Sequence, residues 1–284
     1  MSQSIAIVTG ANSGMGLSTV VELAKRGYRV IMACRSPQRG EAARLEAIKQ
    51  SGSDAIELLV CDLGSLESIR QFAGQFLSRH DTLDVLVNNA GVVNLKRRTT
   101  KDGFEEMIGV NHLGHFLLVY LLLPALERAK AGRIVVVSSG AHKAGSIRFD
   151  DPHLTRGFNV VIGYAQSKLA NILFTRELAR RLQGTRVTVN AVHPGAVATN
   201  LGVDRNTGFG QFIYKLLRPF FRSPAEGAAT AVYLATSDEV AGVTGHYYYD
   251  NKQASLSAKA RDDEAARRFW SWSEKEVGLG GSGE

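Results

Sequence analysis

The sequence predicts an α/β fold built on a doubly wound parallel sheet of about seven strands, with helices on both faces. Short apolar runs alternate along the chain with segments whose apolar residues repeat at helical spacing. The runs are continuously apolar rather than alternating, which is typical of strands buried on both faces. The first run, residues 5–8, leads into three glycines and a helical segment.

The elements of the first half begin and end at ordinary local signals. Gly27 predicts the end of the first helix, and Ser36 with Pro37 predicts the N-terminus of the second. Strands are expected at 5–8, 29–33, 55–60 and 83–87, and helices at 17–26, 37–52, 66–78 and 103–129.

The second half repeats the alternation without an internal repeat or a linker. Ser223 before Pro224 predicts another helix N-terminus. Strands are expected at 133–137, 187–192 and 245–249, and helices at 161–182, 224–236 and 262–277. The order indicates a Rossmann-type single domain over 1–277, with a substrate lid at about 200–223 and a disordered glycine-rich tail at 278–284.

Composition narrows the class of protein. The 284 residues are 44% hydrophobic, enough for a large core, and carry a net charge of +7. The basic residues are scattered, and the cluster at 96–98 reads as a solvated loop, so no nucleic-acid partner is expected. No signal peptide is seen, residues 116–126 read as a buried helix too short to span a bilayer, and Cys34 and Cys61 are expected to be reduced. We expect a cytoplasmic protein.

The glycine-rich stretch after the first strand suits a dinucleotide. Glycines allow a tight turn and let backbone N–H groups approach a pyrophosphate, and the following helix N-terminus adds positive partial charge. The candidate cofactor-binding residues here are Gly10, Asn12, Ser13, Gly14, Met15 and Gly16. Taken alone, the same stretch also fits a plain structural turn.

Arg35, after the second strand, points to the kind of dinucleotide. An acidic residue at this place would hydrogen-bond the ribose hydroxyls of NAD, whereas an arginine suits a 2′-phosphate through a charge-assisted contact. The predicted cofactor is therefore NADP(H). The alternative is an ordinary surface arginine.

Tyr164 and Lys168 form the catalytic candidate. They stand at i and i+4 of a predicted helix, so their Cβ atoms are about 6 Å apart on one face. An ammonium beside a phenol is expected to lower the pKa of the phenol from about 10. Such a tyrosine can exchange a proton with a carbonyl or alcohol oxygen near neutral pH.

These motifs together resemble the short-chain dehydrogenase/reductase superfamily over about residues 5–250. The resemblance rests on the TGxxxGxG turn, Asn88-Asn89-Ala90-Gly91, the serine pair after the fifth strand and the Tyr164/Lys168 pair. It implies that Tyr164 is the acid/base and that Lys168 also grips the nicotinamide ribose. It further implies that Ser139 hydrogen-bonds the substrate oxygen and that Asn111 holds a water linking Lys168 to solvent.

The resemblance also assigns cofactor contacts at other strand ends. Asp62 would receive the adenine amino group, with Leu63 beside it, although Asp62 could equally cap the next turn. The second Asn of the NNAG stretch and its glycine would lie along the cofactor, or serve only the sheet; the candidates are Asn89, Ala90 and Gly91. The turn that closes over the nicotinamide would contribute Pro194, Gly195, Val197 and Thr199.

Further motifs resemble the branch that holds retinol dehydrogenases, WW-domain oxidoreductases and protochlorophyllide reductases. They are residues 111–116 (NHLGHF), 167–171 (SKLAN) and 272–275 (WSEK). Ala196 stands where protochlorophyllide reductases carry a cysteine, which argues against the light-driven reaction. The connection from Ser139 to Tyr164 is longer than in compact members, which could obstruct the pairing of two copies through the helices beside the fifth strand.

An apolar stripe at 209–220 follows the nicotinamide turn and is expected to lie over the substrate. Its apolar residues recur at helical spacing, with basic residues between them. The substrate-binding candidates are Ser139, Phe209, Phe212 and Ile213. The alternatives are a lid helix packed on the core and a weak membrane-surface contact through 209–221.

The sequence thus predicts an NADP-dependent oxidoreductase that interconverts a small hydrophobic alcohol and its aldehyde or ketone. The alternatives are a reductase of a large cyclic or tetrapyrrole-like substrate and, from another class, an NADP-sensing binding module. His112 and His115 stand at i and i+3 but have no evident third ligand, so no metal is expected. A homodimer is an open alternative, and the sequence identifies neither the substrate nor the direction of the reaction.

Overall fold

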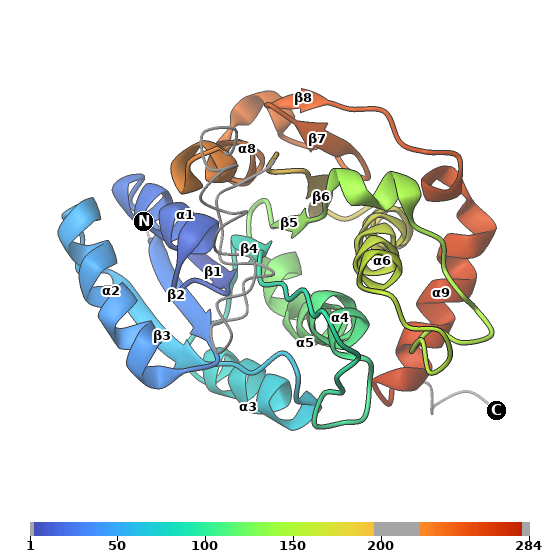
Figure 1. The fold of residues 1–284 in the computed structure, drawn as a ribbon. Coiled ribbons are helices and arrows are strands. Elements are labelled where there is room, and N and C mark those ends of the chain that lie inside the picture. The colour runs from blue at the N-terminus through green and yellow to red at the C-terminus, as the bar shows by residue number, and fades with distance from the viewer. Residues whose placement is uncertain (1–2, 196–221, 280–284) are drawn as a thin grey trace.

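One eight-stranded sheet runs through the computed structural model of this chain, which describes residues 3–195 and 222–279 (Figure 1). The strands are, in spatial order, β3 (Ile56–Val60), β2 (Arg29–Cys34), β1 (Ile5–Thr9), β4 (Val85–Asn88), β5 (Arg133–Val137), β6 (Thr188–Val192), β7 (Tyr247–Tyr249) and β8 (Lys252–Gln253). The strand order confirms the predicted doubly wound sheet, because the chain moves outward from β1 on one side and from β4 on the other.

The sheet has one strand more than the seven predicted. β1 to β7 pair in parallel, whereas β8 pairs antiparallel with β7 through Tyr248–Gln253 and Tyr249–Lys252. Asp250 and Asn251, both at positive φ, make the tight turn between them. A two-residue exposed strand has no apolar run of its own, so the hydrophobic pattern carries no signal for it.

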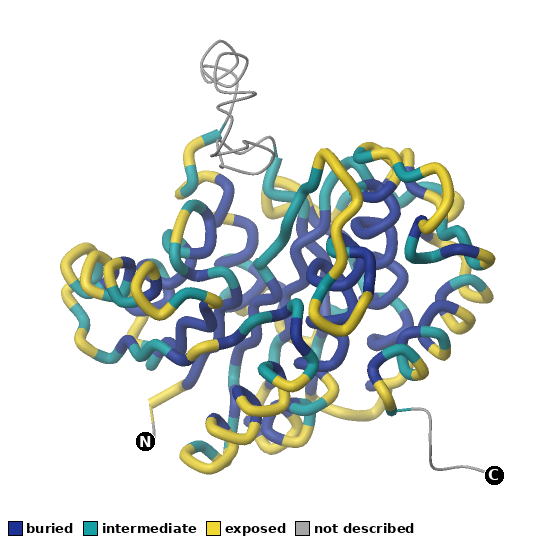
Figure 2. Tube along the Cα trace, turned by 60° about the horizontal axis from the view of Figure 1, so that its bottom comes forward, coloured by how far each residue is buried: buried dark blue, intermediate teal, exposed yellow. Residues whose placement is uncertain are grey.

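Alternate residues of the continuously apolar strands enter two separate cores. Figure 2 shows the buried strands as the dark centre of the molecule. One core packs under α1 (Gly14–Lys25), α2 (Pro37–Ser51) and α8 (Pro224–Thr236). The other packs under α3 (Leu66–Leu77), α5 (Gly114–Arg128) and α6 (Val160–Arg181). The predicted caps hold: Ser36 accepts from Arg39 N, and Ser223 forms a capping box with Glu226.

The long helix predicted at 103–129 runs without a break from Glu106 to Arg128, but its first part is not regular α-helix. The chain there forms a short α4 (Glu106–Ile108), then a π-helical segment, η1 (Gly109–Leu113), and only then α5. The stretch Glu106–Arg128 is long and apolar enough to cross a membrane by length and composition, which corrects the expected shortness. However, 78% of the most apolar 18 residues of this stretch are buried inside the fold, as expected of a core helix.

The C-terminal helix α9 (Asp263–Glu276) lies outside α6 (Figure 1). Its Trp270 stacks on Phe174 of α6 at 5.8 Å and meets Phe116 of α5 edge-on at 4.7 Å. Gly278 and Leu279, the first residues of the predicted tail, close the end of this helix through hydrogen bonds to Lys275 O and Glu274 O. A buried aromatic layer therefore covers the outer side of α5 and α6.

Several predicted residues lie outside the described part of the chain. They are Val197, Thr199, Phe209, Phe212 and Ile213, together with nearly all of the lid at 200–223 and residues 280–284 of the tail.

Candidate active site

The candidate site lies at the carboxyl ends of β1 and β4, where the strand order reverses and where ligands bind in open α/β sheets. The glycine turn after β1 is sterically demanding. Gly10 has φ +62°, and a Cβ on it would lie 2.9 Å from Ala90 Cα. A Cβ on Gly16 would lie 2.4 Å from Gly10 O and 2.6 Å from Asn89 Nδ2. These positions therefore exclude other residues.

Thr9 joins the glycine turn to the end of β4. Its hydroxyl oxygen accepts from the backbone N–H groups of Asn89 at 2.9 Å and Ala90 at 3.0 Å, and lies 2.8 Å from His115 Nε2. The Asn89 side chain donates to Thr9 O at 2.7 Å. The structure therefore gives Asn89 and Ala90 a structural role, while their positions beside the turn also suit a cofactor.

The N-terminus of α1 keeps its amides available. Ser13 occupies the N-cap position, but its side chain makes no cap hydrogen bond, and Gly14 has φ +54°. Asn12 is half-buried in the turn, and Met15 packs into the core under α1. First-turn N–H groups without a side-chain cap are suited to an anionic ligand such as a pyrophosphate.

The residues beyond β2 and β3 surround the same edge. Arg35 is exposed, and its guanidinium has no hydrogen bond or ion pair with any residue in the described part of the chain. Asp62 Oδ1 accepts from Gly64 N at 3.0 Å, so the local capping role that the sequence left open is real. Leu63 is buried, and a Cβ on Gly114 would lie 2.4 Å from its carbonyl oxygen.

Tyr164 and Lys168 lie one turn apart on α6, with Lys168 Nζ 5.6 Å from the centre of the tyrosine ring. Lys168 is buried, and Nζ donates to Val137 O at 3.2 Å. Loss of water lowers the pKa of Lys168 to about 8. Burial raises the pKa of Tyr164, although the Ser139 hydroxyl opposes this. The expected fall in the Tyr164 pKa is therefore wrong for the protein alone.

Asn111 sits in the π-helical segment, a feature that often occurs at functional sites. Its Oδ1 accepts a hydrogen bond from Val92 N at 2.7 Å. Its Nδ2 donates to Val92 O at 3.0 Å and to Ser167 Oγ at 3.0 Å. Asn111 thus ties the loop after β4 to the helix that carries Tyr164. A Cβ on Gly91 would lie 3.4 Å from Asn111 Oδ1 and 3.6 Å from Lys168 Nζ, so the glycine leaves space over both groups.

The two serines after β5 have separate roles. Ser138 is buried and donates to Lys168 O at 2.8 Å, which anchors the helix to the sheet. Ser139 is half-buried, and its hydroxyl accepts from Ala141 N at 3.2 Å. Of the two serines, Ser139 is the one whose hydroxyl lies within hydrogen-bond reach of Tyr164, so it stays our candidate for the substrate contact.

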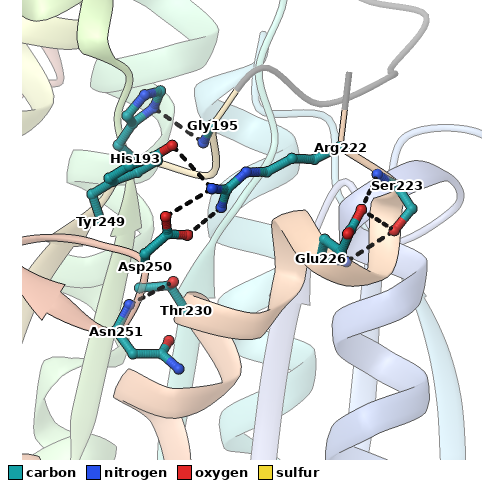
Figure 3. A network of polar contacts seen from close by, with 9 residues as sticks. All are labelled: His193, Gly195, Arg222, Ser223, Glu226, Thr230, Tyr249, Asp250 and Asn251. Carbon is teal, nitrogen blue, oxygen red and sulfur yellow. Dashed lines mark hydrogen bonds and ion pairs between the residues drawn. The ribbon is translucent and has the colours of Figure 1, made fainter. Parts of the chain in front are cut away.

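The turn after β6 contains a residue that the sequence did not single out. Pro194 and Gly195 are half-buried, and Gly195 has φ +82°. The ring of His193, just before them, accepts a hydrogen bond from the Gly195 N–H of this turn (Figure 3). It also accepts one from a backbone N–H in the turn after Ser139. Its signal in the sequence was a polar side chain in the last position before a Pro-Gly turn.

The two histidines at i and i+3 have different hydrogen-bond partners. His112 Nε2 lies 2.8 Å from Ser273 Oγ, and His115 Nδ1 lies 3.2 Å from Asn111 O. Burial lowers their pKa values to about 3 and about 4. Among residues 3–195 and 222–279, no group of three His, Cys, Asp or Glu side chains could hold a metal ion.

These residues fit a nicotinamide dinucleotide. The glycine turn and uncapped α1 suit its pyrophosphate, and the space over Gly91 lies between them and Lys168. At the far end, a phenol, a serine hydroxyl and a buried ammonium converge at the ends of β5 and α6. The arrangement can bind an anionic dinucleotide and move a proton beside its far end.

The chain is similar to known proteins in sequence. The short chain dehydrogenase family model matches residues 4–208. Retinol dehydrogenase 14 from Homo sapiens is 48% identical over an alignment of 290 positions, which covers 96% of this chain and 86% of that protein. Retinol dehydrogenase 13 from Homo sapiens is 46% identical, covering 96% of this chain and 84% of that protein.

Solved structures share the fold. An uncharacterized protein from Mycobacterium paratuberculosis matches with a TM-score of 0.79 and 36% identity, covering 98% of this chain and 94% of that one. A short chain dehydrogenase from Shigella flexneri, whose structure is complexed with NADP, matches with a TM-score of 0.69 and 23% identity over 87% of this chain and 96% of that one.

Proposed function

The chain belongs to the short-chain dehydrogenase family, and we propose that it is an NADP(H)-dependent oxidoreductase that interconverts a hydrophobic alcohol with its aldehyde or ketone. The observation that carries the proposal is the placement of Tyr164 and Ser139 around one end of the site, with Lys168 Nζ 5.6 Å from the tyrosine ring. The glycine turn occupies the other end.

The chain's own residues handle orientation and the proton. In the direction of reduction, Ser139 Oγ donates a hydrogen bond to the carbonyl oxygen, and the Tyr164 hydroxyl delivers a proton to it. When bound, NADP(H) supplies or accepts the hydride. Lys168 would hold the ribose of the bound cofactor and, when charged, favours the phenolate that remains on Tyr164. Asn111 connects the loop that follows β4 to helix α6, which keeps both in place around these groups.

Arg35 supports NADP(H) rather than NAD(H). It is an exposed guanidinium without a partner in the described chain, directly after β2, where the adenosine ribose binds in this type of fold. A 2′-phosphate gives such a group a charge-assisted partner. The NADP of the Shigella flexneri structure is in line with this preference.

The substrate class that we propose is a retinoid alcohol or aldehyde. The relatives at 46–48% identity are named retinol dehydrogenases, and such an apolar polyene suits the hydrophobic substrate expected from the sequence. Phe209, Phe212 and Ile213 stay our candidates for its apolar contacts. A tetrapyrrole-like substrate has no comparable support among these relatives.

The test is reduction of all-trans-retinal by the purified protein with NADPH and, separately, with NADH, followed by product analysis. We expect turnover with NADPH, less with NADH, and loss of turnover in Tyr164→Phe. A panel of straight-chain aldehydes and ketones distinguishes a wrong substrate class from a wrong reaction. NADPH binding without turnover of any carbonyl would instead favour the NADP-sensing module.

A further inference from the structure

His193 joins two turns that belong to different parts of the site. Its Nδ1 accepts the backbone N–H of Gly140, directly after Ser139, at 3.3 Å. The same Nδ1 accepts the N–H of Gly195, in the turn after β6, at 3.3 Å (Figure 3). One ring nitrogen therefore serves both the substrate-side turn and the cofactor-side turn.

The two donors fix the protonation state of the ring. Because both partners are N–H groups, Nδ1 must carry a lone pair, so His193 is neutral with its proton on Nε2. A protonated imidazole would present a third N–H to the two amides and would lose both hydrogen bonds.

The ring is held in place by its neighbours. His193 N donates to Tyr248 O at 2.9 Å, and the ring stacks on that of Tyr249, with centroids 5.0 Å apart and planes 22° apart. The Tyr249 hydroxyl, at the far end of that ring, accepts from Arg222 Nη2 at 3.0 Å. Arg222 also forms an ion pair with Asp250 in the β7–β8 turn. A stacked ring with a fixed backbone has little freedom to leave the two amides.

We propose that His193 is a positioning residue that holds the Ser139 turn and the Pro194–Gly195 turn in a fixed relation through one unprotonated ring nitrogen. This inference rests on the proposed function, in which Ser139 meets the substrate oxygen and the Pro194–Gly195 turn meets the nicotinamide end of the cofactor. The separation of the two turns then sets the separation of substrate and cofactor, on which the rate depends steeply.

The surrounding charges keep the ring neutral. Burial lowers the pKa of His193, and His142, Arg222 and Lys143 lower it further, whereas Asp250 alone opposes them. The balance places the pKa of His193 below its ordinary 6.5. The two hydrogen bonds to His193 Nδ1 are therefore intact at neutral pH and are lost when the pH falls through this lowered pKa.

Two variants separate the acceptor from the ring. His193→Asn places an amide oxygen close to the position of Nδ1, so it can accept both N–H groups but does not titrate. His193→Phe keeps an aromatic ring against Tyr249 but has no acceptor. Tyr249→Phe serves as the control, because it leaves the His193 acceptor untouched and removes only the hydroxyl that Arg222 contacts.

The first measurement needs no turnover. Amide hydrogen exchange and chemical shifts of Gly140 and Gly195 are followed by NMR from pH 7.5 to 4.5 in the wild type and in both variants. We expect both wild-type amides to lose protection together, with one midpoint below pH 6.5. In His193→Asn both should stay protected, and in His193→Phe both should be unprotected throughout. Separate midpoints, or protection unaffected by pH, would overturn the proposal.

The second measurement is the pH dependence of kcat and KM for retinal reduction. We expect His193→Phe to lower kcat about tenfold or more, as the loss of shared hydrogen bonds suggests, with a smaller change in KM. His193→Asn should recover most of kcat and lack the acidic limb of the wild type. Normal kcat in a folded His193→Phe protein would refute the positioning role.

The failures of the two proposals are distinguishable. A wild type that reduces no carbonyl, or a Tyr164→Phe protein with normal turnover, contradicts the proposed function while the NMR result still decides the role of His193. If His193→Phe does not fold, the wild-type titration and His193→Asn decide the matter by themselves.

Discussion

Lys168 Nζ lies 5.6 Å from the centre of the Tyr164 ring, one turn along α6, and burial shifts the pKa values of the two groups toward their neutral forms. Electrostatic attraction between a charged lysine and a phenolate would shift both pKa values the other way. The i, i+4 spacing in the sequence indicates only this attraction. The burial of both side chains depends on the packing of η1, β5 and α6 against one another, and the spacing of residues along one helix cannot predict it.

The buried Lys168 should make the fold less stable at neutral pH. Its pKa is about 8 in the folded protein against an ordinary value of 10.5, so protonation favours the unfolded chain by about 3 kcal/mol. We expect Lys168→Met to raise the free energy of unfolding at pH 7. The wild type should recover this difference as the pH rises from about 8 to 10.5, because the unfolded chain then binds more protons.

Urea unfolding of both proteins at pH 7 and pH 10 measures this effect, with exposed Lys130→Met as the control. The same difference at both pH values would show that Lys168 is not destabilised by burial. Turnover should be lost in Lys168→Met whatever its stability, as is common where a site retains a costly group.

Tyr164→Phe removes the proposed proton donor and keeps the ring. We expect kcat for retinal reduction to fall at least about 100-fold, the lower end of general acid–base catalysis, with the Kd for NADPH little changed. Steady-state kinetics and fluorescence titration measure the two quantities. Tyr120→Phe, on an exposed part of α5, is the matched control. Near-normal turnover would remove Tyr164 from the mechanism.

Arg35→Ala tests the choice of cofactor. The Kd for NADPH should rise by the equivalent of about 1–3 kcal/mol, the range for a hydrogen bond to a charged group, while the Kd for NADH changes little. Arg26→Ala removes an exposed arginine that pairs with Glu22 at the other end of α1, and it should affect neither cofactor. Equal weakening of both cofactors by Arg35→Ala would disprove the 2′-phosphate contact.

Trp270→Ala tests the contribution of α9 to stability. Trp270 is 7% exposed and contacts Phe116, Phe174 and the Arg181 guanidinium, so its truncation should cost about 3–5 kcal/mol of unfolding free energy. Trp272→Ala, at a half-buried position on the same helix, should cost clearly less. Denaturant unfolding compares the two, and equal losses would mean that the buried layer does not hold the helix.

The sequence predicted most of the fold because a buried parallel sheet leaves a strong local signal. Mostly apolar runs mark β1 to β6, although Glu57 interrupts the run of β3 and Asn190 that of β6. Ser36 and Ser223 mark helix N-termini by their own chemistry. β8 left no such signal, because its stability comes from pairing with β7 and from the turn at Asp250 and Asn251.

The site was predictable where chemistry follows spacing along the chain. The structure places Tyr164, Lys168 and Ser139 together, but whether they catalyse the reaction stays a prediction. The π-helical turn at Asn111 was not predictable, because apolar periodicity cannot register one extra residue within a helix. His193 was missed for another reason: its partners, Gly140 and Gly195, are backbone groups, which have no identity in a sequence.

The hydrogen bond between His112 and Ser273 connects groups 161 residues apart in the chain. At ordinary ribosomal speeds of about 5–20 residues per second, α9 follows η1 by roughly 8–32 s. During synthesis the π-helical turn that carries Asn111 must therefore wait, without its outer aromatic cover, for a helix that has not yet been made. The nascent chain can form the glycine turn early, but it completes the neighbourhood of Asn111 only after α9 has left the exit tunnel.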